Sequence, residues 1–482
     1  MNLFKIVTVL CLFLHGTVAI GQTSASPGLD GPAALTGILN SYHAGSGSAS
    51  AGTNQVTVAS LTGQRTSTRN LAVGDLVLVM QMQDSSIPAN AGLHEYAQIS
   101  SIFGSVLTLN RLLTNTYVQS VTAAGGVTTA WRTFQVVRVP QYSSATLAAG
   151  NTVTADRWTV SNINGQGTGG IVAIDVAGST TVNGIISVDG AGFRGGAGVN
   201  GDGSRAGAAF TDANYNFNPL DANGSVKGEG TVGTPFQIFD GTATRLAYST
   251  VTFGQGYAAG AAGLGAQGSA GGGGNDGSPA TDNRNNSGGG GGANSSAGGQ
   301  GGNSWADQTI AGGKGGNAVT NSITRMVLGG GGGAGSSNNN GDADAVTAWP
   351  PNPAGRAVPP ATGTANGAAG PISSSGASGG GVVLLRTGSL SATSGIITAR
   401  GYDAHNNIGG SESAGGGGAG GSLSIVSASG TGAGLSLLAN GGGGGYSNYF
   451  DHGPGEGDGG GFVSTSSNLT DVATSVEGGA FG

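Results

Sequence analysis

Several residue types that support most secreted or catalytic proteins are scarce in this sequence. Its one cysteine, Cys11, lies in the first apolar run, so the rest of the chain can form no disulfide and offers no thiol chemistry. Charged residues make up only 9% of the chain and aromatic residues 6%. The formal net charge of −7 argues against nucleic acid as a partner.

Helical patterns and long apolar runs are also missing. After the N-terminus no useful apolar stripe has the 3.6-residue period of a helix, and no run approaches the roughly 18 residues of a membrane span. The chain has 14 prolines and lacks a strict Gly-X-Y period, which excludes collagen. We therefore expect an all-β protein with no membrane span.

The N-terminus predicts a secretory signal peptide, residues 1–21. Lys5 supplies the positive charge, Ile6–Leu14 is apolar but too short to cross a bilayer, and Ala19 and Gly21 are small residues before a cleavage site. Cleavage there would leave a secreted protein, extracellular or at the outer cell surface. An uncleaved anchor is the alternative.

Residues 22–142 predict a small all-β domain. Short β-branched and apolar runs are separated by turn residues, and several alternate with period two. The predicted strands are Asn54–Leu61, Asp75–Gln83, Tyr96–Ile102, Ser105–Leu113 and Phe134–Tyr142.

Three later segments align without gaps, at Gly169–Gly190, Gly380–Gly401 and Gly420–Gly441. Each segment has a pair of apolar positions two residues apart near its start and a second such pair near its end. This spacing indicates two short strands, each with one buried face. One such unit cannot bury its apolar face alone, so stacking predicts a parallel β-solenoid. Similar antiparallel hairpins in a β-sandwich are the alternative.

Two columns of this alignment pair opposite charges, because Asp175 aligns with Arg386 and Asp189 with Arg400. If the first two units are adjacent rungs, each aspartate faces its arginine across neighbouring parallel strands, about 4.8 Å apart. The segment between the two units would then leave the solenoid at one corner and return to the next rung.

Glycine supplies 101 of the 482 residues, much of it in runs such as Gly288–Gly292 and Gly329–Gly333. Glycine-only stretches can form threefold extended helices like polyproline II and pack through their peptide groups; a solvated low-complexity loop is the alternative. The fold expected is therefore an N-terminal β domain followed by a β-solenoid-like stack with a polyglycine II-like insertion. The predicted division is first rungs at 143–190, glycine-rich insertion at 191–379, and further rungs with a glycine-rich end at 380–482.

The strings GDLVLVMQMQ, VVRVPQY, VNGIISVDGAGFRGG and SAGGGGAGGSLSI resemble glycine-rich secreted cell-surface and adhesin-like proteins of Gram-negative bacteria. The resemblance covers roughly residues 50–445 and implies an exported structural or adhesive role. The C-terminal VEGGAFG departs from this group, because it contains no recognisable sorting or anchoring module.

Metal and cofactor signals are weak. His43, His94, His405 and His452 have no metal-like spacing, so we interpret them as surface or loop histidines. Two acidic glycine-rich loops offer calcium oxygen ligands or are simply solvated turns. Their residues are Glu456 with Asp458, and Asp342 with Asp344. No cofactor is expected.

No repeat unit places two carboxylates on one strand face, so catalysis is not expected. Tyr446, Tyr449 and Phe450 are candidates for stacking on a sugar, or they form a cap over the solenoid end. The leading hypothesis is a secreted, non-enzymatic structural or adhesive protein that contacts a polysaccharide or protein surface. A carbohydrate-binding or polysaccharide-active solenoid is the alternative. Ice binding is less favoured, because the sequence lacks a regular Thr-x-Thr ladder.

Overall fold

The computed structural model describes residues 27–124, 127–160, 165–198, 224–235, 237–239, 245–247, 257, 260–275, 286–303, 312–337, 374–407, 412–447 and 452–482. The predicted signal peptide therefore lies outside the described residues. Their regular structure is almost entirely β, and the short 3-10 helix η1 (Pro88–Asn90) is the one helix among them.

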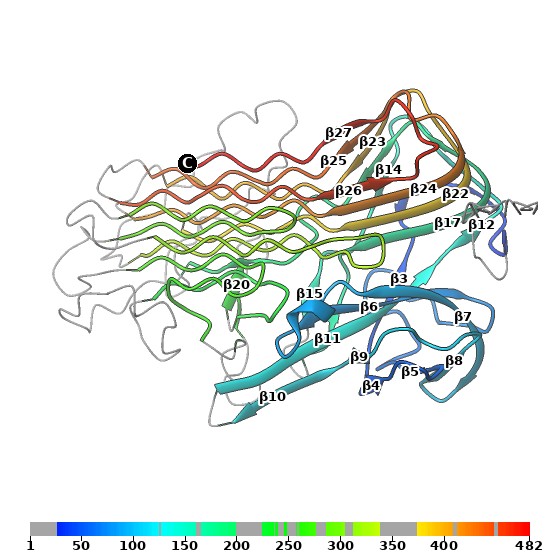
Figure 1. The fold of residues 1–482 in the computed structure, drawn as a ribbon, viewed down its shortest axis with the longest axis horizontal. Coiled ribbons are helices and arrows are strands. Elements are labelled where there is room, and N and C mark those ends of the chain that lie inside the picture. Colours follow the sequence, from blue (N-terminus) through cyan, green and yellow to red (C-terminus); the bar gives the residue numbers. More distant parts are fainter. Residues whose placement is uncertain are drawn as a thin grey trace, which may run out of the picture.

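Two parallel sheets form a solenoid in which each rung supplies one strand to each sheet (Figure 1). Sheet A contains, in spatial order, β1 (Pro32–Ala34), β13 (Ser144–Leu147), β17 (Ile171–Val182), β22 (Val382–Ala392), β24 (Ser422–Gly430) and β26 (Phe462–Thr465), with β12 (Gln141–Tyr142) beside β17. Sheet B contains β2 (Gly37–Ile38), β14 (Thr152–Thr154), β18 (Ile185–Ser187), β23 (Gly395–Thr398), β25 (Leu435–Leu438) and β27 (Ala473–Ser475). The predicted stack is confirmed. Its rungs at 144–154 and 462–475 lie within the predicted solenoid ranges, whereas the rung at 32–38 comes from the stretch predicted as the N-terminal domain.

The register between neighbouring rungs follows the columns of the sequence repeat. In the β17–β22 ladder Val172 faces Val383 and Asp175 faces Arg386, and in the next ladder Val383 faces Leu423. The ladder is parallel throughout. The long excursion between β18 and β22 thus returns to the adjacent rung without breaking the stack.

Both faces of sheet A are buried in its middle rungs. Val172 and Ile174 point inward, toward the core shared with sheet B, whereas Ile171 and Ala173 belong to a second core on the outer face. The alternating pattern predicted one buried face, and this is wrong for Ile171–Val176, where every residue is buried. The cause is the antiparallel sheet, which covers the outer face.

That antiparallel sheet has the order β10–β11–β6–β7–β8–β5, with β3 on β11. Its strands are β3 (Ser41–Ala44), β5 (Gln55–Thr57), β6 (Leu76–Asp84), β7 (His94–Phe103), β8 (Val106–Leu109), β10 (Ser120–Ala124) and β11 (Val127–Val139). Leu76 and Leu78 of β6 pack on sheet A, while Val77 and Val79 face a third core. Period two thus places this sheet between two apolar layers.

Three small sheets complete the regular structure of the described residues. Their strands are β4 (Ser48–Ala49) with β9 (Tyr117–Val118), β15 (Thr159–Val160) with β16 (Gly167–Thr168), and β19 (Gly195–Gly196) with β20 (Gln237–Phe239) and β21 (Arg245–Ala247).

Several glycine-rich segments continue directly from the solenoid strands. Extended chain enters sheet A at 374–381, 413–421 and 453–461, and leaves sheet B at 401–407, 440–446 and 476–482. With further passes between residues 192 and 336 they form one bundle, drawn as wavy traces beside the solenoid (Figure 1). We call these segments glycine helices.

Residues 329–336 show how the glycine helices are held together. Every third amide donates to the same neighbour: Gly329 to Gly380, then Gly332 to Ala377. The neighbours that accept from 329–336 lie at 374–380, 287–293 and 226–229, and those that donate to it lie at 193–196, 271–274 and 413–419. A threefold helix with six hydrogen-bonded neighbours is the ordered polyglycine II-like packing that the sequence predicted.

Packing at this density leaves no room for a Cβ at many glycine positions of the bundle interior. A Cβ built on Gly331 would lie 1.9 Å from the backbone oxygen of Arg194, and one on Gly333 would lie 1.9 Å from that of Gly272. Both obstacles are backbone atoms that are themselves hydrogen-bonded. The glycine content is therefore a requirement of close backbone approach and not a sign of flexibility.

Replacing Gly331 with alanine should destabilise the protein by about 3 kcal/mol or more, because overpacking and the loss of interhelix hydrogen bonds act together. Gly104→Ala is the control: its Cβ would meet nothing within 4 Å, and it costs only the strain of a φ of 58°. Chemical denaturation measures both, and amide exchange across 288–302 reports the bundle directly. Equal losses in the two variants would contradict the interpretation.

Candidate functional site

The Asp189–Arg400 pair joins two rungs at the corner where sheet B gives way to the glycine helices. Asp189 Oδ1 accepts hydrogen bonds from Thr398 Oγ1 and from the Arg400 amide, both at 2.6 Å. Its Oδ2 accepts from Arg400 Nε at 3.1 Å and Nη2 at 3.0 Å. Both carboxylate oxygens are thereby occupied.

The Asp175–Arg386 pair lies on the outer face of sheet A. Arg386 Nη2 is 3.2 Å from Asp175 Oδ1, and the side chain of Asp175 is fully buried. Tyr96 of β7 covers the guanidinium, with its ring centroid 4.4 Å from Arg386 Cζ. This pair therefore links the solenoid to the antiparallel sheet in addition to linking two rungs.

A cleft of about 470 Å³ opens beside Asp189. We call it the junction cleft; its lining includes Thr154, Arg157, Ser187, Asp189 and Tyr402. These residues come from the ends of β14 and β18, from the segment before β15, and from the first glycine helix after β23. Three successive rungs thus place two hydroxyls, a guanidinium, a phenol and an ion-paired carboxylate around one space.

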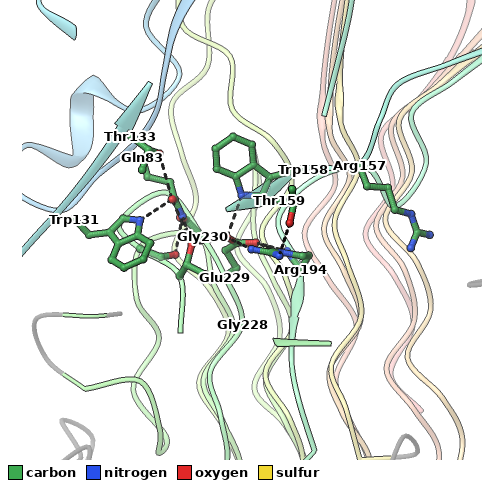
Figure 2. A network of polar contacts seen from close by, with 12 residues as sticks. Gln83, Trp131, Thr133, Arg157, Trp158, Thr159, Arg194, Gly228, Glu229 and Gly230 are labelled. Atoms are coloured by element: carbon green, nitrogen blue, oxygen red, sulfur yellow. Dashed lines mark hydrogen bonds and ion pairs between the residues drawn. The ribbon is translucent and has the colours of Figure 1, made fainter. Parts of the chain in front are cut away.

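Arg157 and Trp158 point in opposite directions, as the extended chain around them requires. The Arg157 Cζ lies 5.0 Å from the Tyr402 ring centroid, which is a cation–π contact. Trp158 points instead into the buried network of Figure 2, where Arg157 lies apart from the other side chains. Gly190 brings its backbone against the Tyr402 ring, since a Cβ there would lie 2.2 Å from that ring.

The network in Figure 2 holds a glycine helix against the antiparallel sheet. Glu229 forms an ion pair with Arg194, at 2.8 Å from Nε, and accepts from Trp158 Nε1 at 3.0 Å. Gln83 of β6 accepts from Trp131 Nε1 at 2.8 Å and donates to two backbone oxygens of the 230–233 turn. These polar groups are buried and mutually satisfied, so the network is structural.

The predicted aromatic contacts are separate from the junction cleft. Tyr446 is the last residue of the glycine helix 440–446; it is 48% exposed and does not line the cleft. Tyr449 and Phe450 lie outside the described residues, as do Asp342 and Asp344 of one predicted calcium loop.

The other predicted calcium loop is not a loop. Asp458 lies in a glycine helix, and its side chain is 3% exposed. Burial raises the pKa of Asp458 well above 3.8; the backbone amide of Gly292 opposes this shift, and the nearby charges of Asp403 and Glu456 add to it. Within the described part of the chain, no cluster of three or more His, Cys, Asp or Glu residues could hold a metal ion.

The interpretation of the histidines as surface or loop residues is wrong. His43, His94, His405 and His452 are all at most 5% exposed. Burial lowers the pKa of His405 to about 4, so it is neutral near pH 7. They pack as small polar aromatics, a role that no spacing in the sequence reveals.

No helix in the described residues has the length and hydropathy of a transmembrane span.

Replacing Asp175 with asparagine should cost about 3 kcal/mol or more, because it removes the fully buried charged partner of the Arg386 guanidinium, which is itself only 12% exposed. Arg111→Ala is the comparison: Arg111 is 53% exposed and lies 4.0 Å from Glu95. A surface pair of this kind contributes at most about 1 kcal/mol. Urea denaturation measures the free energy of unfolding of both variants. If Asp175→Asn loses as little stability as Arg111→Ala, the buried ion pair does not stabilise the fold as proposed.

Because the pKa of the Asp458 carboxyl is raised in the folded protein, we expect the free energy of unfolding to fall as pH rises. The folded state keeps this carboxyl protonated after the unfolded chain has ionised, so each pH unit between 3.8 and the raised folded pKa costs about 1.4 kcal/mol. Asp458→Asn should remove this slope and be more stable than the parent at pH 8. Thermal melts from pH 4 to pH 8 test it, with the exposed Asp471→Asn as the control. Parallel profiles for parent and Asp458→Asn would refute it.

Comparison with known proteins identifies no family: no family model and no curated protein sequence matches the chain. Among solved structures, phage tailspikes match over about a third of it, each with a TM-score of 0.16. They are gp61 of Pseudomonas phage phi297 (15% identity, 34% of this chain and 28% of that chain), gp49 of Pseudomonas phage LKA1 (15%, 32% and 26%) and Gp54 of Acinetobacter baumannii bacteriophage AP22, solved with a capsular saccharide (12%, 33% and 26%). The chain spans about a quarter of the length of these proteins.

Proposed function

We propose that this chain is a secreted, non-enzymatic adhesive protein of the cell surface that binds polysaccharide through the junction cleft. The cleft carries the proposal because its lining suits a hydroxylated ligand. Thr154 and Ser187 offer hydroxyls, Tyr402 a phenol and Arg157 a guanidinium. Its volume of about 470 Å³ falls within the range of small-molecule sites.

Binding without catalysis fits the hydrogen bonding of Asp189, the one carboxylate among the residues that line the junction cleft. Glycoside hydrolysis generally uses two carboxyl groups on opposite sides of the bond that breaks, about 5–9.5 Å apart. Asp189 is the single acid among the residues that line the junction cleft, and Arg400 and Thr398 occupy both its oxygens. An acid held in this way is poorly placed to donate a proton or to attack a sugar.

An adhesive role also fits the rigidity of the scaffold. The junction cleft is built on strand ends and on the start of a glycine helix, all held by ladders of backbone hydrogen bonds. Such a site loses little conformational entropy when a ligand binds. The predicted signal peptide supports the extracellular location, and a purely structural role without a ligand is the competing hypothesis.

Glycan-array binding followed by titration of the best ligand tests the proposal. Tyr402→Ala and Arg157→Gln should each weaken binding at least about tenfold, the loss expected for one hydrogen bond to a charged or polar partner. Tyr402→Phe keeps the ring and should lose less.

Tyr446→Ala is the matched control, because it removes an exposed tyrosine outside the cleft. Melting temperatures show whether each variant is folded. Loss of binding in Tyr446→Ala alone would place the contact at the predicted aromatic cluster. Saturable release of reducing sugar from any polysaccharide would overturn the non-enzymatic assignment, and an array without any ligand would favour the purely structural role.

A further inference from the structure

A second, larger cleft lies between the antiparallel sheet and the glycine bundle. Its volume is about 590 Å³, and we call it the bundle cleft. One wall is the loop after β6, with Ser85 and Pro88; the opposite wall comes from the bundle, with Gln267, Asn317 and Arg325. The bundle cleft shares no lining residue with the junction cleft.

The walls of the bundle cleft are fixed by hydrogen bonds on both sides. Asp84 accepts from the amides of Ser86 and Ile87 at 2.9 and 2.8 Å and from Asn90 Nδ2 at 3.1 Å, which ties down the loop. The Asp84 amide in turn donates to the Thr231 oxygen across the cleft floor, at 2.8 Å. The carboxylate of Asp84 is therefore committed to the loop.

Arg325 brings a positive charge to this cleft without a carboxylate to balance it. Its Nε donates to Ala91 O at 3.0 Å, Nη1 to Thr320 O at 2.6 Å and Nη2 to Pro88 O at 3.2 Å. Among the described residues no Asp or Glu forms an ion pair with it. Three of the five guanidinium N–H groups are thus held by neutral carbonyl oxygens, which leaves two for a ligand.

Neutral polar groups and small apolar surfaces surround this cation. The side-chain amides of Gln267 and Asn317 make no hydrogen bond within the described part of the chain, and Val232 and Val319 supply apolar surface. Burial without a nearby acid lowers the pKa of Arg325, but a guanidinium still remains charged near neutral pH. The cleft therefore combines an unbalanced cation, free amides and apolar contacts.

We propose that the bundle cleft binds an acidic oligosaccharide and that the Arg325 guanidinium receives the carboxylate of a uronic acid residue. A carboxylate supplies the charge that Arg325 lacks, and the planar fork of arginine matches carboxylate geometry. Sugar hydroxyls satisfy the amides of Gln267 and Asn317, while the C–H faces of the ring pack on the valines. The assignment depends on the proposed carbohydrate-binding function, because a secreted adhesive protein meets such polymers outside the cell.

Calorimetric titration of the whole secreted chain with a purified oligogalacturonide tests this site, with the carboxyl-reduced neutral oligosaccharide as the paired ligand. The oligogalacturonide should bind at least about tenfold more tightly than the neutral form. Arg325→Gln should remove that preference, and raising the salt concentration should reduce it. Arg111→Gln is the control, because Arg111 is an exposed arginine that does not line the cleft.

Arg325 also joins two segments, so a second variant separates binding from folding. Asn317→Ala keeps the hydrogen bond from the Asn317 amide to the Gly268 oxygen and should weaken oligogalacturonide binding at least about threefold, without a change in melting temperature. Equal affinity for the two oligosaccharides would overturn the proposal, as would full affinity in both Arg325→Gln and Asn317→Ala.

Failure here is distinguishable from failure at the junction cleft. If Tyr402→Ala abolishes glycan binding while Arg325→Gln leaves it unchanged, the proposed function stands and the acidic site is refuted. If the oligogalacturonide binds through Arg325 and Tyr402→Ala has no effect on any ligand, the acidic site stands and the junction cleft is not the contact.

Discussion

Hydrogen bonding between the backbones of neighbouring glycine helices is the interaction on which the rest of this molecule depends. Every backbone N–H at 329–336 donates to one of three neighbouring segments, and carbonyl oxygens of 329–336 accept from three other segments. Peptide groups satisfied in this way can be buried without the penalty of an unpaired polar group. Because the contact surface is backbone, any Cβ directed into it collides with a carbonyl oxygen, as the 1.9 Å approach at Gly331 shows.

The solenoid solves the main difficulty of such a bundle, which is entropy. Glycine loses more backbone freedom on ordering than any other residue, and a row of identical glycines does not specify its own register. Here the glycine helices at 374–381 and 413–421 lead into β22 and β24, whose ladder is fixed by side chains such as Val383 against Leu423. The apolar core thus sets the register that the bundle propagates. The solenoid core fixes the register and the glycine helices supply the hydrogen bonds. Together they explain how a chain with 101 glycines in 482 residues reaches a defined structure without disulfides.

Much of this architecture could be predicted from the sequence, because it depends on short-range periodicity and on segments that repeat along the chain. The period of two and the aligned columns at Asp175 and Arg386 predict the parallel register of β17 and β22, which the ladder has. The recurrence of glycine runs predicts an ordered bundle. The remainder depends on which surfaces meet: the burial of Ile171 and Ala173 follows from the antiparallel sheet lying over sheet A. The junction cleft unites Arg157, Asp189 and Tyr402, which are far apart in sequence and share no motif.

The chemistry of the clefts follows from the same backbone constraint. A surface made of peptide groups presents carbonyl oxygens and amides, so neighbouring elements recognise it with polar side chains and not with apolar ones. Gln83 donates to the oxygens of Gly230 and Gly233, and Arg325 is likewise held by carbonyl oxygens alone. Where such recognition is incomplete, hydrogen-bonding groups line the space left over, together with a single tyrosine in each cleft, Tyr402 or Tyr257. A fold that replaces side-chain packing with peptide packing is therefore better suited to hydroxylated, strongly hydrated ligands than to apolar ones, which is the physical ground for proposing carbohydrate as the ligand.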